Sequence, residues 1–179
     1  VLSSEFTSGH APALLSALQE TLRAKDYWPM LAGTPSWRSS RKPAFDALIS
    51  RGVEGLVILP ALLDDPIVAE ILKLQIPAVV AYGVSGTPRI PSVRVDDVGM
   101  RDLVGHLVKL GHRSIACLTG PLQVHSARSR TSAFQHACNL YKEKGVDGQI
   151  TEVSEFSGSA AAEGVSIIMS RRRAVTAIV

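Results

Sequence analysis

Residues 55–82 read GLVILPALLDDPIVAEILKLQIPAVVAY, and this stretch decides the fold. Its two ends, residues 55–60 and 77–82, are short runs with apolar side chains at successive positions, which is typical of strands buried on both faces. Between them, apolar residues at helical spacing follow an N-cap candidate, Asp64 or Asp65. The stretch therefore predicts a strand–helix–strand unit of a parallel sheet.

The same alternation extends in both directions from this unit. Toward the N-terminus, one helix is expected to start near Pro12 and another to be capped by Ser39 or Ser40. Toward the C-terminus, we expect strands at residues 93–95, 114–119, 150–153 and 174–179, and helices from Asp96 or Asp97 to Gly111, from Ser126 to about Lys144, and from about Ser159 to Arg171. This pattern predicts an α/β fold with two doubly wound parallel-sheet lobes, at residues 1–95 and 96–179. Because the chain begins and ends inside apolar stretches, we expect a fragment of a longer chain, cut at both ends.

Composition narrows the classes of function. The 179 residues include 19 basic and 16 acidic side chains, and the net charge of +3 is too small to indicate nucleic-acid binding by itself. The two cysteines form no Cys-x-x-Cys pair or Cys/His cluster, so we expect a reducing compartment and neither a disulfide framework nor a structural zinc. No apolar run approaches the ~18–20 residues that span a bilayer.

Enzyme motifs are also missing from the sequence. It has no G-x-S-x-G elbow, no G-x-G-x-x-G loop and no G-x-x-x-x-G-K-[ST] loop, which are the signatures of a serine hydrolase and of dinucleotide and triphosphate sites. We therefore expect no catalytic residues, no cofactor and no metal ligands.

Five segments, taken in order, resemble the LacI/GalR family of bacterial transcription repressors. The most specific is HLVKLGHRSIA at residues 106–116, which is similar to the family pattern HL-x-x-LGHR-x-IA. The others are RGVEGL at residues 51–56, IPAVV at 76–80, SVRVDD at 92–97, and GPL with SARSRTSAF at 120–122 and 126–134. Each segment alone is weak evidence for the family, whereas all five in this order and at the family's spacing are strong evidence. The resemblance covers essentially the whole chain and matches the family's effector-binding core, which is periplasmic-binding-protein-like.

The resemblance implies a function. A small molecule, a sugar or sugar acid, would bind between two lobes and change the affinity of a repressor for its operator DNA. The resemblance also implies that the family's helix-turn-helix headpiece and the part that completes the second lobe are not in this chain, so the second lobe is expected to be incomplete. Operator DNA is therefore an expected partner only through that headpiece. The resemblance also implies a cytoplasmic homodimer with no membrane partner, and the amphipathic first helix is a candidate for the dimer surface. The alternative is a periplasmic solute-binding protein of a sugar transport system, which has the same core.

Three residues of the first lobe are candidate ligands of this effector. Glu5 lies where many relatives carry aspartate, and a carboxylate can accept hydrogen bonds from adjacent hydroxyls, although an exposed loop acid would look the same. His10 can stack on or hydrogen-bond a ligand, or it marks a helix start or a dimer surface. Tyr82 also stands where relatives carry aspartate, which puts a standard hexose in doubt. Its ring suits a pyranose face, and the alternative is a half-buried tyrosine at a strand end.

The second lobe contributes Arg128, Arg130 and Phe156. A guanidinium presents five fixed donors that suit hydroxyls, carboxylates and phosphates, and in the family this segment supplies a ligand-binding arginine. Since Arg128 and Arg130 lie two positions apart on a helix, both cannot point the same way, and one is expected at the surface or bridging the lobes. Phe156 stands where the family has an aromatic residue lining the cleft, and the alternative is core packing. Asp96 is expected to cap a helix.

Overall fold

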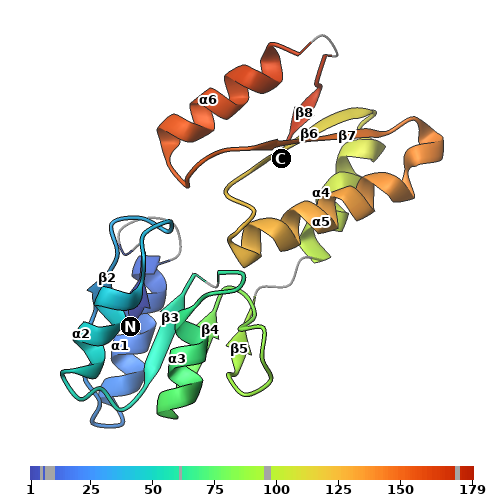
Figure 1. Cartoon of the computed structure of the whole chain (residues 1–179). Coiled ribbons are helices and arrows are strands. Elements are labelled where there is room, and N and C mark those ends of the chain that lie inside the picture. The colour runs from blue at the N-terminus through green and yellow to red at the C-terminus, as the bar shows by residue number, and fades with distance from the viewer. Residues whose placement is uncertain (5, 7–10, 61, 95–97, 172–173) are drawn as a thin grey trace. The chain divides into compact units, whose positions relative to one another are not determined.

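A computed structural model describes residues 1–4, 6, 11–60, 62–94, 98–171 and 174–179. The chain divides into two compact units, Val1–Arg94 and Val95–Val179. Each unit contains a sheet with helices packed on it, running from blue to green in the first unit and from yellow-green to red in the second (Figure 1). All strand pairs are parallel, which confirms the α/β class predicted from the sequence. Among the described residues, no helix is both long and apolar enough to cross a membrane.

The first unit is built on a five-stranded sheet in the order β2-β1-β3-β4-β5. Its strands are β1 (Leu2–Ser3), β2 (Ala32–Gly33), β3 (Leu56–Leu59), β4 (Ala78–Ala81) and β5 (Ser92–Val93). Its helices are α1 (Ala11–Arg23), α2 (Lys42–Ile49) and α3 (Ile67–Leu74). The chain winds from β1 to β2 and then in the opposite direction through β3 to β5, so its helices cover both faces of the sheet.

Alternate residues of the central strands pack against different helices. Ile58 and Val80 belong to a buried cluster with Phe45 of α2 and Ile71 of α3. On the other face, Leu59 packs with residues of α1, in a cluster that also contains Ala81. This arrangement explains why strands β3 and β4 are apolar at successive positions, because both faces of the sheet are covered.

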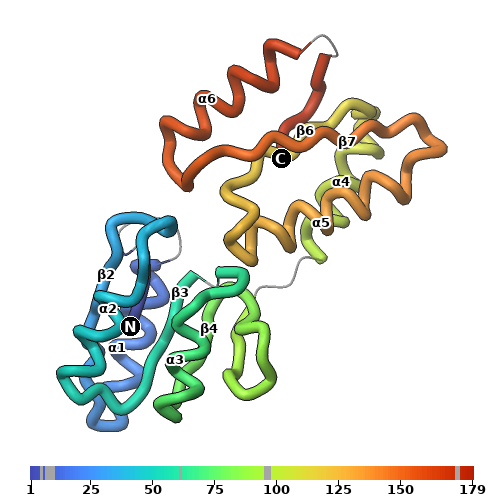
Figure 2. Tube along the Cα trace, in the orientation of Figure 1, coloured from blue at the N-terminus to red at the C-terminus, as the bar shows by residue number. Residues whose placement is uncertain are grey.

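The second unit has a three-stranded sheet in the order β7-β6-β8. Its strands are β6 (Ser114–Thr119), β7 (Asp147–Glu152) and β8 (Ala177–Ile178), and its helices are α4 (Val98–Lys109), α5 (His125–Leu140), the short 3-10 helix Lys142–Lys144 and α6 (Gly158–Met169). Ile115 and Cys117 face α4 and α5 in one buried cluster. Leu118 faces α6, where a Cβ added to Gly164 would lie 2.4 Å from Leu118 Cδ1. Within this unit, α6 and the α4–α5 pair therefore cover opposite faces of the sheet (Figure 2).

Several boundaries differ from the sequence-based expectation. Helix α5 ends at Leu140 and not near Lys144, because Tyr141 (φ −111°, ψ 14°) leaves the helical region and a 3-10 turn follows. Gly145, at φ 79°, then turns the chain. Strand β7 consequently begins at Asp147, three residues before the expected start.

The helix caps also differ in detail. The N-cap position of α2 is Arg41, and the neighbouring Ser40 Oγ accepts a 3.3 Å hydrogen bond from the Lys42 N–H. The N-cap position of α3 is Pro66 and not Asp64 or Asp65, although Asp65 Oδ1 accepts a 3.2 Å hydrogen bond from the Ile67 N–H at the start of this helix. The expected caps Asp96 and Asp97 lie outside the described residues.

Candidate functional site

Open parallel sheets bind ligands beyond the carboxyl ends of their strands, where the strand order reverses. In the first unit this point lies between β1 and β3, whose last residues Ser3 and Leu59 pair in register. In the second unit it lies between β6 and β8, and residues 120–122 leave β6 at this point. Each unit therefore has one candidate ligand-binding edge at the carboxyl ends of its strands, called the first edge in the first unit and the second edge in the second unit.

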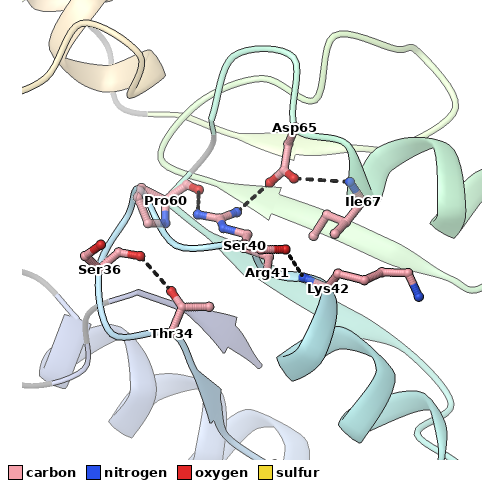
Figure 3. A network of polar contacts seen from close by, with 8 residues as sticks. All are labelled: Thr34, Ser36, Ser40, Arg41, Lys42, Pro60, Asp65 and Ile67. Atoms are coloured by element: carbon pink, nitrogen blue, oxygen red, sulfur yellow. Dashed lines mark hydrogen bonds and ion pairs between the residues drawn. The ribbon is translucent and has the colours of Figure 1, made fainter.

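A buried ion pair supports the edge of the first unit (Figure 3). Arg41 Nη1 lies 2.8 Å from Asp65 Oδ2, and the two side chains are 2% and 6% exposed. Arg41 Nη2 donates a 2.8 Å hydrogen bond to the carbonyl of Pro60, the residue that follows β3. One guanidinium thus connects the start of α2, the loop after β3 and Asp65, the residue before the N-cap of α3.

Burial dominates the electrostatics of this pair. Desolvation lowers the pKa of Arg41, while the charge and the hydrogen bond of Asp65 act in the opposite direction. Within the described part of the chain, Arg41 Nε is buried and has no hydrogen-bond partner. Sequence analysis missed this network because the two residues lie 24 positions apart and neither stands in a recognisable motif.

Tyr82 follows β4 at the same edge and has an unusual backbone conformation. Its φ is 60°, in the left-handed region that a residue with a bulky side chain rarely adopts. Its N–H donates a 2.8 Å hydrogen bond to the carbonyl of Val93, and its side chain packs against the cluster of Val1, Leu59 and Ala81. Tyr82 is thus held at the strand end by both backbone and side chain. The other two candidates of this unit, Glu5 and His10, lie outside the described residues.

The edge of the second unit is formed by the ends of β6 and β7, which pair at Thr119 and Glu152. The ring of Phe156 lies directly against Gly120, where an added Cβ would be 2.2 Å from the Phe156 Cε1. Any residue other than glycine would displace the ring, so the close approach explains the glycine. Because 51% of Phe156 is exposed, the ring also presents a surface to solvent at this edge.

Arg128 and Arg130 lie exposed near the start of α5 and bind different backbone groups. Arg128 Nε donates to the Leu122 carbonyl at 3.2 Å, and Arg130 Nε donates to the Ser126 carbonyl at 3.1 Å. Burial raises the pKa of the Cys117 thiol in β6, and the positive charge of Arg130 acts against this rise. Arg130 is therefore close enough to β6 for its charge to act on the sheet.

Glu152 is a further residue at this edge, and sequence analysis missed it. Its Oε1 accepts a 2.9 Å hydrogen bond from the Leu122 N–H. The second unit thus brings Arg128, Glu152 and Phe156 together around residues 120–122, with a cation, an anion and an aromatic ring. The signal for Glu152 is its position at the end of a strand, and the predicted strand at residues 150–153 already contained it.

The described residues contain no group of three or more His, Cys, Asp or Glu side chains that could hold a metal ion. At both edges the side chains offer hydrogen-bond donors, acceptors and aromatic surface, which suits recognition of a polar small molecule.

Comparison with known proteins identifies the family. The family described as "Periplasmic binding proteins and sugar binding domain of LacI family" matches residues 10–170. An uncharacterized HTH-type transcriptional regulator in the aml 5′ region of Streptomyces limosus is 28% identical over 143 residues, which is 76% of this chain and 41% of that protein. The chain thus spans about two-fifths of the length of this relative.

Two solved structures have the same fold. A LacI transcriptional regulator from a Rhodococcus species has a TM-score of 0.83 at 24% identity, covering 99% of this chain and 65% of that one. The Cra transcriptional dual regulator from Pseudomonas putida, solved in complex with fructose 1-phosphate, has a TM-score of 0.86 at 17% identity. The match covers 99% of this chain and 66% of the Cra chain. Since the family match extends over most of the sequence, the chain belongs to the family of periplasmic binding proteins and LacI-type sugar-binding domains.

Proposed function

We propose that this chain is the effector-binding core of a bacterial LacI-type transcription regulator and that its effector is a sugar or sugar acid. The observation that carries the proposal is the family match to the LacI sugar-binding domain over residues 10–170. The Streptomyces relative is named as a transcriptional regulator, which favours regulation over the alternative of solute transport. In this proposal residues 1–95 and 96–179 are the two lobes of the core, and the protein binds its ligand without transforming it.

The side chains at the second edge favour a sugar that carries a negative charge. The first turn of α5 contains no acidic residue, and a helix N-terminus favours anions. Arg128 and Arg130 add guanidinium donors, and the exposed ring of Phe156 can stack on a sugar face. The neighbour solved with fructose 1-phosphate supports the same class of ligand.

At the first edge, Tyr82 is proposed to contribute its ring or its hydroxyl to the ligand. Glu5 and His10 follow β1 in the sequence, and we keep them as proposed contacts. A neutral hexose would gain less than a sugar acid or a phosphosugar from the arginines, because hydrogen bonds between two charged groups are the stronger ones.

Regulation requires that the effector bind two arrangements of the protein with different affinity, since equal affinity shifts no equilibrium. We propose that the regulator acts in the cytoplasm as a homodimer and contacts operator DNA through a headpiece outside this chain, because two-fold dimers read palindromic sites. Residues 27–31, between α1 and the edge strand β2, form an exposed apolar stretch, and this stretch supports self-association. Trp28 in this stretch is 76% exposed and Leu31 is 51% exposed.

The test is thermal unfolding of the complete gene product against a panel of sugars, sugar acids, phosphosugars and nucleobases. A ligand at a hundred times its Kd stabilises the protein by about 2.7 kcal/mol. We expect a saturable rise in the unfolding temperature that Arg128→Ala or Arg130→Ala reduces. A rise that neither substitution changes would refute the proposed arginine contacts.

A second measurement separates regulation from transport. The complete gene product is mixed with DNA fragments from the region upstream of its own gene, and binding is followed by fluorescence anisotropy with and without the panel compound that stabilises it. A regulator binds one fragment specifically and changes its affinity with the compound. Binding of the compound by a protein that binds none of the fragments would favour the transport alternative.

A further inference from the structure

We propose that Glu152 is a positioning residue of the second edge, which fixes residues 120–122 and, through Leu122, the side chain of Arg128. This inference rests on the proposed function for its consequence, because Arg128 is a proposed effector contact. The chain of contacts itself is a property of the free protein and can be tested without an effector.

Leu122 is held on both sides of its Cα. Its N–H donates to Glu152 Oε1 at 2.9 Å, and its carbonyl accepts from Arg128 Nε at 3.2 Å. These two groups belong to adjacent peptide units, and Leu122 lies inside a turn that is closed by the 2.9 Å hydrogen bond from the Val124 N–H to the Pro121 carbonyl. Because this turn restricts the φ and ψ of Leu122, fixing the first peptide unit also restricts the orientation of the second. Glu152 at the end of β7 is thereby connected to Arg128 on α5 through one residue.

The loop occupies the point where the sheet order reverses, which is where such sheets bind ligands. On its other side it is held by the ring of Phe156 against Gly120. A loop held in this way keeps the donors of Arg128 in one orientation before a ligand arrives, and affinity rises when fewer groups must be ordered on binding.

The hydrogen bond between Glu152 and Leu122 is expected to contribute little to the stability of the fold. Glu152 is exposed and Leu122 is only half-buried, and polar contacts at the surface contribute little to the stability of a fold. We therefore expect Glu152→Ala to lower the unfolding temperature by no more than about 4 °C. Its main effect is expected on the order of the Arg128 side chain.

The conservative variant separates positioning from charge. In Glu152→Gln, the side-chain oxygen still accepts from the Leu122 N–H, whereas Glu152→Ala removes the acceptor. Glu155→Ala is the matched control, because Glu155 is an exposed acid of the following loop whose Oε1 accepts from Ser157 Oγ at 2.9 Å. It touches neither Leu122 nor Arg128 in the hydrogen bonds described.

The experiment is nuclear magnetic resonance of the ¹⁵N-labelled protein without ligand. Hydrogen exchange is measured at the Leu122 amide and at Arg128 Nε–H in the wild type and in the three variants. We expect exchange at both positions to accelerate about tenfold in Glu152→Ala and to stay near the wild-type rate in Glu152→Gln and Glu155→Ala. An unchanged rate at Arg128 Nε–H in Glu152→Ala would overturn the proposal, and so would an equal acceleration in Glu155→Ala.

Fructose 1-phosphate is then titrated into the same samples. If it shifts the Arg128 Nε–H signal of the wild type, we expect Glu152→Ala to bind it more weakly than Glu152→Gln does. Equal binding by these two variants would refute the consequence for the effector. If fructose 1-phosphate shifts no signal of the wild type while the exchange rates change as expected, the positioning role stands and fructose 1-phosphate is excluded as a ligand of this edge.

Discussion

The buried ion pair of the first unit gives the sharpest prediction for stability. Arg41→Met keeps an apolar stem of similar length but leaves the Asp65 carboxylate, which is 6% exposed, without its counter-charge. The Pro60 carbonyl also loses a hydrogen-bond donor. Removal of one partner from a buried ion pair destabilises a protein by about 3–5 kcal/mol, and we expect Arg41→Met to fall in this range.

Two further variants test the reasoning behind this magnitude. Lys42→Met removes the neighbouring pair with Asp46, whose side chains are 50% and 54% exposed, and we expect a loss of no more than about 0.5 kcal/mol. The double variant Arg41→Met with Asp65→Leu removes both buried charges. Because a buried pair can be replaced by apolar residues at little or no cost, we expect it to be more stable than Arg41→Met alone.

The assay is unfolding in urea followed by tryptophan fluorescence. The two tryptophans of the chain, Trp28 and Trp37, both lie in the first unit, so the signal reports on the unit that contains the ion pair. A loss below about 1 kcal/mol for Arg41→Met would refute the reasoning, since it would lie outside the range for a buried pair. A double variant less stable than Arg41→Met alone would refute it as well.

Three other predictions concern Gly120, Cys138 and Trp28. Gly120→Ala should lower the free energy of unfolding by no more than about 1 kcal/mol, because it displaces the ring of Phe156, which is 51% exposed and can move toward solvent; the double variant with Phe156→Ala should recover much of the loss in a urea titration. Burial raises the pKa of the Cys138 thiol from 9.0 to about 11. The unfolded chain therefore loses this proton first, and the free energy of unfolding should fall as the pH rises from about 9 to about 11, with a smaller fall in Cys138→Ala when unfolding is measured across this range. Trp28→Glu places a charge in the exposed apolar stretch, and if the proposed homodimer forms through this stretch, the variant should sediment as a monomer where the wild type sediments as a dimer; a variant that stays dimeric would exclude this stretch from the interface.

Local patterns explain why much of the fold could be predicted from the sequence. Strands β3 and β4 follow directly from apolar runs at residues 55–60 and 77–82, because only a sheet covered on both faces buries side chains at every position. The two lobes with parallel sheets follow from the repeated alternation of such runs with helical segments. The predicted end of α5 was wrong, because the helix breaks at Tyr141, where no glycine or proline marks the position in the sequence.

The candidate site was harder to predict from the sequence, because its contacts join segments that are distant in the chain. Arg41 and Asp65 meet only after β3 and α3 are packed, and nothing local to either residue indicates an ion pair. Glu152 reaches Leu122 because β6 and β7 pair in a register that places their ends together. Arg128, Arg130 and Phe156 came from a family resemblance, and their roles toward a ligand stay predictions.

The central claim is that the edge of the second unit binds a sugar-like anion through the arginines of α5. It is tested most directly by calorimetric titration of the complete gene product with the panel compound that raises its unfolding temperature. Arg128→Ala and Arg130→Ala are compared with Lys109→Ala, which removes an exposed charge at the end of α4. Because a hydrogen bond to a charged group contributes about 1.5–3 kcal/mol, we expect at least one arginine variant to bind about 10- to 100-fold more weakly and Lys109→Ala to bind as the wild type does. Equal affinity in all four proteins would contradict the claim.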